Sequence, residues 1–257
     1  IEGILAFFME ATFFAVMFFG WGKVGKRFHL VSTWLTGIGA TISAYWILVA
    51  NGWMQNPVGT TFNPETVRSE MASAAAFWEV ISNPVAVSKF FHSVTSGWVT
   101  GGVFVVGVSC WFLLHKRQQE FARKSILIGS IVGLVGSVAV MLSGDSSGIH
   151  AAEFQPMKLA AAEGLEDGGS RAAFTIVPGV KVPGMLSILA THDIDGFVPG
   201  INDILKGYTD NDGNVIPSVA EKMQRGRTAL DALAAYRTLK DTDPEAAAAA
   251  GGRLGEE

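Results

Sequence analysis

The sequence predicts an all-α, polytopic membrane helix bundle of four transmembrane helices, joined to a mainly helical extracytoplasmic region with a small hairpin. Three observations lead to this prediction. Hydrophobic residues make up 49% of the 257 residues, and the mean hydropathy is +0.34. Long apolar stretches end at Ser143, and all seven Trp lie at or before Trp111. The part from Gly144 onward is polar and rich in Ala and Gly, so two regions with different surroundings are expected.

Charge divides the chain at the same point. Residues 1–143 hold nine Lys and Arg against six Asp and Glu, whereas residues 144–257 hold ten against seventeen. The basic part is typical of a membrane segment, and the acidic part of a water-facing one. A single Cys excludes a disulfide-stapled secreted fold, and we expect no nucleic-acid partner for this acidic chain.

Four apolar stretches are long enough to cross a membrane, because a transmembrane helix needs about 20 mainly apolar residues. Trp21, Trp53 and Trp111 lie near the ends of these stretches, where amphipathic rings favour the headgroup level. The expected spans are residues 1–21, 28–53, 85–114 and 121–143.

The loops between the spans predict their orientation. The first loop holds Lys23, Lys26 and Arg27, and the third, residues 115–124, is also basic. The second loop, residues 55–84, carries one Arg against three Glu. Positive charge marks cytoplasmic loops, so the second loop and residues 144–257 are expected on the outer side of a bacterial cytoplasmic membrane.

The outer region is too long to be a simple connection. Pro178-Gly179 separates two β-prone runs and predicts the hairpin. After Pro217, apolar residues recur at nearly helical spacing and predict an amphipathic surface helix. The part beyond Pro244 is low in complexity and is expected to be disordered. The apolar positions of the surface helix are Val219, Met223, Leu230, Leu233 and Tyr236.

The start of the chain has no basic region and no cleavage site, so it is not a signal peptide. We expect the chain to be the central part of a longer protein. Its first span contains Glu2 and Glu10, and carboxyl groups at membrane depth are costly. On a helix they differ by about 80° in direction, so both can face one interior seam. They are candidates for a proton-conducting pair; the alternatives are a helix-pairing carboxyl and a helix-end residue near headgroups.

His92 lies inside the third span, among small residues that include Gly97 and Gly101. A neutral imidazole is a common axial ligand of haem iron, and small residues would leave room for a flat macrocycle. They would equally allow a close neighbouring helix. From the residues alone, a haem ligand and a hydrogen-bonded packing histidine are both open.

The other histidines and the cysteine point less clearly to a function. His29 adjoins a basic loop and is expected at the membrane interface, and His115 belongs to the other basic loop. His150 and His192 lie in the outer region, and Cys110 is a lone residue at lipid depth. No Cys-x-x-Cys-His motif of covalently bound haem is present.

Three motifs together resemble subunit I of the cytochrome bd-type quinol oxidases. They are SAYWILVANGWMQNPVG, KFFHSVTSGWVTGG and SGDSSG. The resemblance is firm from Ile1 to about Glu163 and looser to Lys240. It implies a subunit of nine transmembrane helices, of which this chain would hold the third to the sixth and part of the outer quinol-binding loop.

The resemblance also implies roles for single residues. Glu2 and Glu10 match the proton-path carboxylates, and His92 matches the axial ligand of the low-spin haem b. In QPMKLAAAEG, Lys158 and Glu163 match the quinol-loop lysine and glutamate. Taken alone, those two would be read as a solvated loop helix, because on a helix they diverge by about 140°. Supporting roles are expected for Asn51, Ser43 and Asp145.

The implied activity is quinol oxidation coupled to reduction of oxygen to water, which generates a proton motive force without pumping. The high-spin haem b, the haem d and the methionine partner of His92 are expected outside this chain, in the complete subunit. Expected partners are a second large membrane subunit, small single-helix subunits and the bilayer. Two other classes stay open: a haem-free proton or ion translocator in which Glu2 and Glu10 line a channel, and a structural subunit that scaffolds a redox partner.

Overall fold

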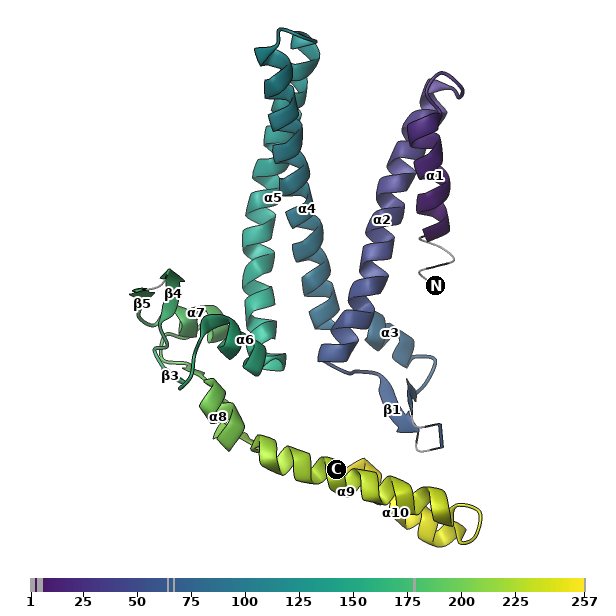
Figure 1. Cartoon of the computed structure of the whole chain (residues 1–257), viewed down its shortest axis with the longest axis vertical. Coiled ribbons are helices and arrows are strands. Elements are labelled where there is room, and N and C mark those ends of the chain that lie inside the picture. Colours follow the sequence, from purple (N-terminus) through teal and green to yellow (C-terminus); the bar gives the residue numbers. More distant parts are fainter. Residues whose placement is uncertain (1–2, 4–6, 64, 67, 178, 257) are drawn as a thin grey trace. The chain divides into compact units, whose positions relative to one another are not determined.

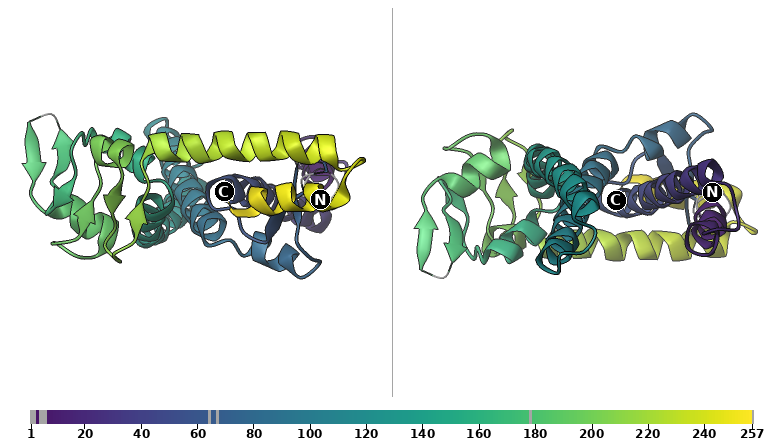
Figure 2. Two further views of the ribbon diagram at one scale, coloured as in Figure 1. Left: turned by 90° about the horizontal axis from the view of Figure 1, so that it is seen from below. Right: turned by 90° about the horizontal axis from the view of Figure 1, so that it is seen from above.

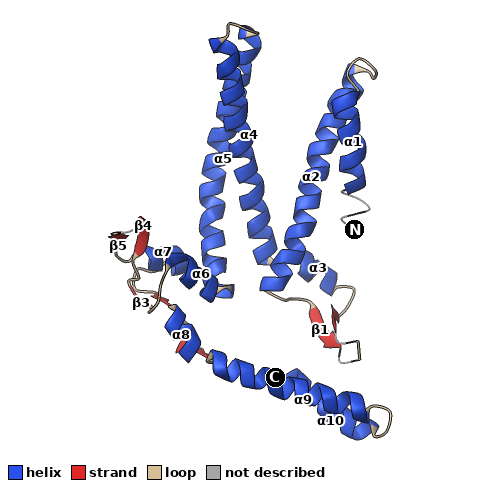
Figure 3. Ribbon diagram, in the orientation of Figure 1, coloured by secondary structure: helices blue, strands red, loops and turns tan. Residues whose placement is uncertain are grey.

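The computed structural model describes residues 3, 7–63, 65–66, 68–177 and 179–256. In this part of the chain helices predominate, and the strands form short two-stranded sheets (Figure 3). The chain divides into two compact units. We call residues 1–58 with 78–147 the membrane unit, and residues 59–77 with 148–257 the loop unit.

Besides most of the short α3 (Ala76–Ile81), the described residues of the membrane unit form four helices. They are α1 (Phe8–Phe19), α2 (Lys26–Gln55), α4 (Pro84–Leu114) and α5 (Gln119–Phe154), whose end from Gly148 belongs to the loop unit. Helix α1 packs along α2, α2 contacts α4, and α4 runs beside α5 (Figures 1 and 2). The fold therefore pairs each helix with its neighbour in sequence.

Three of these helices are long and apolar enough to cross a membrane. Helices α2, α4 and α5 have 30, 31 and 36 residues. Their outer faces carry large apolar side chains such as Trp34, Phe104 and Leu134, which are 69%, 70% and 68% exposed. Such faces require lipid or further helices to cover them. The predicted spans 28–53, 85–114 and 121–143 lie within these helices; of the predicted span 1–21 the structure describes an apolar helix of 12 residues, α1.

Helix α5 is longer than its predicted span. The sequence becomes polar after Ser143, but the helix continues to Phe154. It ends where Gln155 leaves helical backbone angles, directly before Pro156. The change to polar residues after Ser143 thus marks the end of the apolar stretch, whereas the helix itself ends just before the residue that precedes a proline.

The start of α4 is anchored by a buried polar residue. Asn83 precedes Pro84 and accepts a hydrogen bond from the backbone N–H of Val85 at 2.9 Å. Its amide also donates to the backbone oxygen of Asn56, just after α2, at 2.7 Å. Asn83 is fully buried, so both ends of its side chain need these partners. A short helix, α3 (Ala76–Ile81), leads into this junction.

The loop unit contains antiparallel strand pairs and short helices. Strands β4 (Phe174–Val177) and β5 (Val180–Val182) pair antiparallel on either side of the predicted turn, in which Pro178 lies outside the described residues. Helix α6 (Pro156–Glu163) begins at a proline and ends at Gly164, whose φ of +62° favours glycine. The other strand pairs are β1 (Thr60–Asn63) with β2 (Arg68–Met71), β3 (Gly169–Ser170) with β6 (Phe197–Val198), and β7 (Tyr208–Thr209) with β8 (Val215–Ile216). Two further short helices of this unit are α7 (Met185–Thr191) and α8 (Ile201–Lys206).

A small apolar core holds this region together. Leu186 and Ala190 of α7 pack with Val198 of β6 and with Ala172. Leu159 of α6 packs against the same cluster. Helix α6 therefore turns Leu159 toward this core, and this contact fixes the rotation of the helix that carries Lys158 and Glu163.

The last two helices form a helical hairpin. Helix α9 (Val219–Leu239) begins after Ser218, whose hydroxyl accepts from the N–H of Glu221 at 3.1 Å. The predicted surface helix is therefore present, but Met223 and Leu230 are exposed on it rather than buried on one face.

Beyond Pro244 the structure has α10 (Pro244–Glu256) in place of the expected disorder. Ala has the highest helix propensity, and Ala247 and Ala250 are buried. Gly251 lies against the ring of Tyr236 in α9, which runs beside α10 (Figure 2). The low-complexity sequence is rich in alanine, and here it forms a helix.

Candidate functional site

His92 lies on α4, partly exposed, with its ring next to α5. Its Nδ1 is 3.3 Å from the hydroxyl of Ser143. That hydroxyl is itself 2.8 Å from the backbone oxygen of Ala139, to which it donates. Nε2 of His92 makes no hydrogen bond to any residue that the structure describes. One ring nitrogen is thus held by the protein, and the other is available to a ligand.

The contact between His92 and Ser143 belongs to a regular ladder between α4 and α5. Four residues earlier on α4, Ser88 is hydrogen-bonded to Ser147 at 3.0 Å. His92 follows Ser88 by four residues on α4, whereas Ser143 precedes Ser147 by four residues on α5, as expected for an antiparallel helix pair. The register of two helices therefore brings Ser143 to His92.

Glycines allow this pair of helices to approach closely. A Cβ on Gly136 would lie 3.2 Å from the backbone nitrogen of Val99, and one on Gly144 would lie 3.5 Å from Cε1 of His92. In contrast, a Cβ on Gly97 or Gly101 would meet nothing within 4 Å. Those two glycines lie about 140° and 180° around α4 from His92. The open space beside these two glycines is therefore on another face of α4 than the His92 ring.

A polar cluster lies one turn before His92, where α2 ends and α4 begins. The ammonium of Lys89 donates to Oδ1 of Asn51 at 2.9 Å, and the amide of Gln55 donates to the same oxygen at 3.0 Å. Asn51 was expected in a supporting role, whereas Lys89 was not considered. A lysine inside an apolar helix, three residues before a candidate ligand, is the sequence feature that could have identified it.

Ser43 and Asp145, the other two expected supporting residues, lie on α2 and α5. Ser43 is half-buried, whereas Asp145 is exposed and lies two residues beyond Ser143. Both lie in the membrane unit, as His92 does.

Glu10 lies on α1 at a close approach to α2. A Cβ on Gly39 would be 3.2 Å from the backbone nitrogen of Glu10 and 3.4 Å from its Cα. The carboxyl-bearing turn of α1 is therefore packed directly on α2, and Glu10 is half-buried. Glu2, the other predicted carboxylate, lies outside the described residues.

Lys158 and Glu163 lie on α6 of the loop unit. Lys158 is exposed and Glu163 is half-buried. Between them, Leu159 and Ala160 turn toward the interior, and Ala160 is fully buried. The structure places both charged residues on the predicted loop helix. Glu163 follows Leu159 by four residues and so lies on the same side of α6 as Leu159 does, whereas Lys158 lies about 100° away from Leu159.

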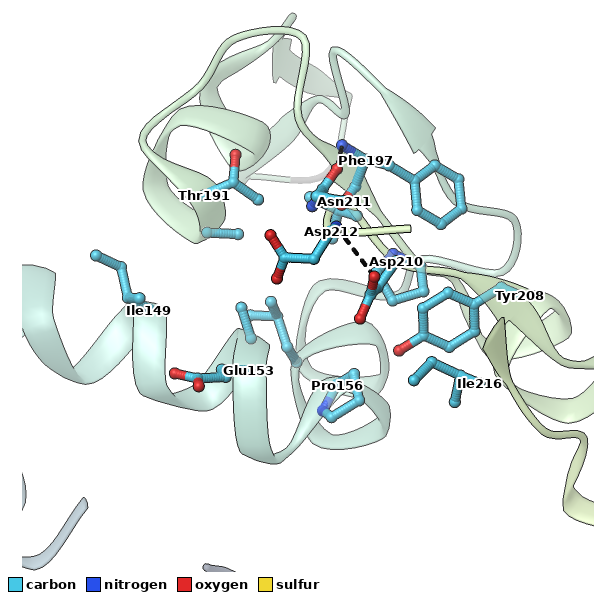
Figure 4. A pocket seen from close by; sticks show the side chains of 15 residues that line it. Ile149, Glu153, Pro156, Thr191, Phe197, Tyr208, Asp210, Asn211, Asp212 and Ile216 are labelled. Carbon is cyan, nitrogen blue, oxygen red and sulfur yellow. Dashed lines mark hydrogen bonds between the residues drawn. The ribbon is translucent and has the colours of Figure 1, made fainter. Parts of the chain in front are cut away.

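A cavity of about 350 Å³ lies in the loop unit, and sequence reasoning did not find it (Figure 4). Glu153 at the end of α5 faces it, and Asp212 reaches toward it from the β7–β8 turn. Pro156 and Ile216 supply apolar walls. Lys158 and Glu163 do not line it. Its walls come from segments far apart in the sequence, so no local motif could have indicated it.

Two residues of the cavity wall, Tyr208 and Asp210, have pKa values that their surroundings shift. Burial raises the pKa of the Tyr208 phenol, and the charge of Asp210 raises it further. Hydrogen bonds from the side chain and backbone of Asn214 lower the pKa of Asp210. At neutral pH the wall thus combines a neutral phenol with an ionised carboxylate. Among the described residues, no group of three or more His, Cys, Asp or Glu is arranged to hold a metal ion.

Comparisons with known proteins agree on one family. The family model of cytochrome bd terminal oxidase subunit I matches residues 1–244. Subunit 1 of the cytochrome bd-II ubiquinol oxidase of Escherichia coli (strain K12) is 40% identical over 240 residues, covering 89% of this chain and 44% of the relative. Subunit 1 of the cytochrome bd ubiquinol oxidase of Bacillus subtilis (strain 168) is 37% identical over 233 residues, covering 85% and 49%.

A solved structure has a similar fold. The bd oxidase from Geobacillus thermodenitrificans matches with a TM-score of 0.63 at 24% identity, over 93% of this chain and 55% of that one. The chain spans about half the length of the curated relatives that it matches.

Proposed function

Because the chain belongs to the cytochrome bd terminal oxidase subunit I family, we propose that it is the central part of a subunit that oxidises quinol and passes the electrons through haems to oxygen. The observation that carries this proposal is the family match over residues 1–244, together with two curated relatives named as ubiquinol oxidase subunits. The proposed activity is that of the complete complex, since this chain spans about half of such a subunit.

In this proposal His92 would hold the iron of the low-spin haem b. An imidazole ligand must be neutral and must offer one unprotonated nitrogen. Nδ1 faces Ser143, and Nε2 has no hydrogen bond to a described residue, so the side chain fits this role. When bound, the haem supplies a one-electron carrier between quinol and the oxygen-reducing site. The other protein ligand of that iron would come from the rest of the complex, which would also hold the high-spin haem b and the haem d.

The quinol site would include Lys158 and Glu163. A quinol releases two protons on oxidation, and a carboxylate such as Glu163 can accept one. The ammonium of exposed Lys158 would orient a quinol oxygen by donating a hydrogen bond. Their divergent placement on α6 means that each would contact a different part of the substrate.

Glu10 would carry protons inward from the cytoplasmic side, followed by Glu2. A carboxyl group at membrane depth can bind and release a proton without a large movement of the backbone. The close packing of Glu10 on Gly39 holds the backbone of that residue against α2. Protons consumed from the cytoplasm and released outside would together separate charge across the membrane.

The proposed setting is a bacterial cytoplasmic membrane, with the region after residue 143 on the outer side. The basic loops at residues 22–27 and 115–124 support this orientation. Exposed apolar faces on α2, α4 and α5 leave room for the bilayer, the remaining helices of the subunit, a second large subunit and small single-helix subunits.

The test is the haem content of the purified complete complex, measured together with oxygen uptake driven by quinol. A complex that contains low-spin haem b and consumes oxygen when quinol is added supports the proposal. A complex without haem that still carries protons or ions would contradict it and favour the translocator.

A further inference from the structure

The hydroxyl of Ser143 decides which nitrogen of His92 carries the proton. A serine has one O–H donor and two acceptor lone pairs. The Ser143 hydroxyl lies 2.8 Å from the backbone oxygen of Ala139 and 3.3 Å from that of Val140, and neither carbonyl oxygen can donate. Its proton is therefore used within α5, and toward His92 it presents a lone pair.

The ring of His92 must then donate. Nδ1 lies 3.3 Å from Ser143 Oγ, and a contact with an acceptor lone pair requires a proton on Nδ1. In a neutral imidazole the proton on Nδ1 leaves Nε2 with its lone pair exposed. That is the tautomer in which Nε2 can bind a metal.

The position of Ser143 is itself fixed. The Ser88–Ser147 hydrogen bond lies one turn away on one side of the pair, and the contact between Gly136 and the backbone of Val99 lies about two turns away on the other. Neither helix can slide or rotate past the other without breaking these contacts. The Ser143 hydroxyl is consequently a fixed acceptor for the imidazole.

We propose that Ser143 is a positioning residue for His92, which holds the imidazole as the Nδ1–H tautomer and sets its rotation for ligation of the haem iron through Nε2. The inference rests on the proposed role of His92 and adds a second residue to that site. A partner on the far nitrogen makes an imidazole a better electron donor, and loss of such a partner weakens metal binding by about 10-fold to 100-fold.

The variants are Ser143→Ala, which removes the acceptor, and Ser143→Thr, which keeps it. The matched control is Ser137→Ala, because the Ser137 hydroxyl also donates to its own helix, at 2.8 Å from the oxygen of Gly133, and among the described residues it has no hydrogen bond to a histidine. Ser147→Ala controls for loss of a hydrogen bond between α4 and α5. All are made in the complete oxidase complex, with its haems.

The readouts are the midpoint potential of the low-spin haem b and the electron paramagnetic resonance spectrum of its ferric form. In Ser143→Ala we expect a higher potential, since a less electron-rich imidazole stabilises ferric iron less, together with shifted g-values. Haem affinity should fall about 10-fold. Ser143→Thr and both control variants should match the parent.

A Ser143→Ala complex with the potential and g-values of the parent overturns the inference. Equal shifts in Ser143→Ala and Ser147→Ala overturn it too, because they would trace the effect to helix packing. His92→Ala separates this result from failure of the proposed function. If His92→Ala keeps the low-spin band, the ligand assignment fails; if it loses the band while Ser143→Ala is unchanged, only the role of Ser143 fails.

Discussion

A Cβ atom on Gly102 of α4 would lie 2.7 Å from the backbone oxygen of Gly129 in α5. The same atom would come within 2.9 Å of the backbone nitrogen of Gly133. The two helices are therefore in backbone contact, on the same ladder that brings Ser143 to His92. Backbone atoms cannot move aside as a flexible side chain can, so this contact constrains the helix pair.

The first prediction concerns this contact. Gly102→Ala should destabilise the complex by about 1–3 kcal/mol, because overpacking forces the helices apart. The adjacent Gly101→Ala is a matched control, since a Cβ there meets nothing within 4 Å. Thermal unfolding of the purified complex measures the difference. Equal stability of the two variants would show that α4 and α5 do not touch at this point.

The second prediction tests the proton path. Glu10→Gln keeps the shape of the side chain but cannot release a proton, so oxygen uptake should fall by at least about tenfold. The haem spectrum should not change, because Glu10 is on α1 and His92 on α4. Glu120→Gln is the control: Glu120 is an exposed residue at the start of α5, paired with Lys124. Full activity of Glu10→Gln would remove Glu10 from the path.

The third prediction concerns the quinol site. Lys158→Ala should raise KM for quinol by roughly 10-fold, since it removes a hydrogen-bond donor to the substrate. Glu163→Gln should lower kcat by about tenfold, since an amide cannot accept a proton from quinol. Haem content should stay at the level of the parent. Glu166→Gln, an exposed change just beyond α6, should leave KM unaltered. Steady-state oxidation of a soluble quinol gives these values, and an unchanged KM in Lys158→Ala together with an unchanged kcat in Glu163→Gln argues against α6 as the site.

The fourth prediction follows from the raised pKa of Tyr208. Burial favours the neutral phenol, so its contribution to stability is present below the pKa of an unfolded tyrosine, about 10, and is lost as pH rises through the higher folded pKa. The charge of Asp210 acts in the same direction, so Asp210→Asn should lower the pKa of Tyr208.

An ultraviolet pH titration measures this effect. The difference between the parent and Tyr208→Phe isolates the one phenol, and the same pair is compared in the Asp210→Asn background. A phenol that titrates at the same pH with and without Asp210 would contradict the predicted coupling.

The hydropathy of the chain was enough to predict the long helices. Apolar stretches over residues 28–53 and 85–114 correspond closely to α2 and α4, because a membrane span needs a continuous apolar surface. The end of α5 was missed, since polarity after Ser143 reports the change of solvent, whereas the helix ends only before Pro156.

The site was predictable only in part. His92 could be singled out because a histidine at membrane depth is costly. Its partner Ser143 could not, since the contact depends on the register between α4 and α5, which no local pattern reveals. The cavity beside Glu153 and Tyr208 depends in the same way on tertiary contacts.

The central claim is that His92 binds the low-spin haem b of a quinol oxidase. Its most direct test is the reduced-minus-oxidised optical spectrum of the purified complete complex, for His92→Ala against the parent. His115→Ala serves as the control, because His115 lies exposed at the other end of the same helix. We predict that His92→Ala alone loses the low-spin haem b band and quinol-driven oxygen uptake. A low-spin band of full intensity in His92→Ala would contradict the account.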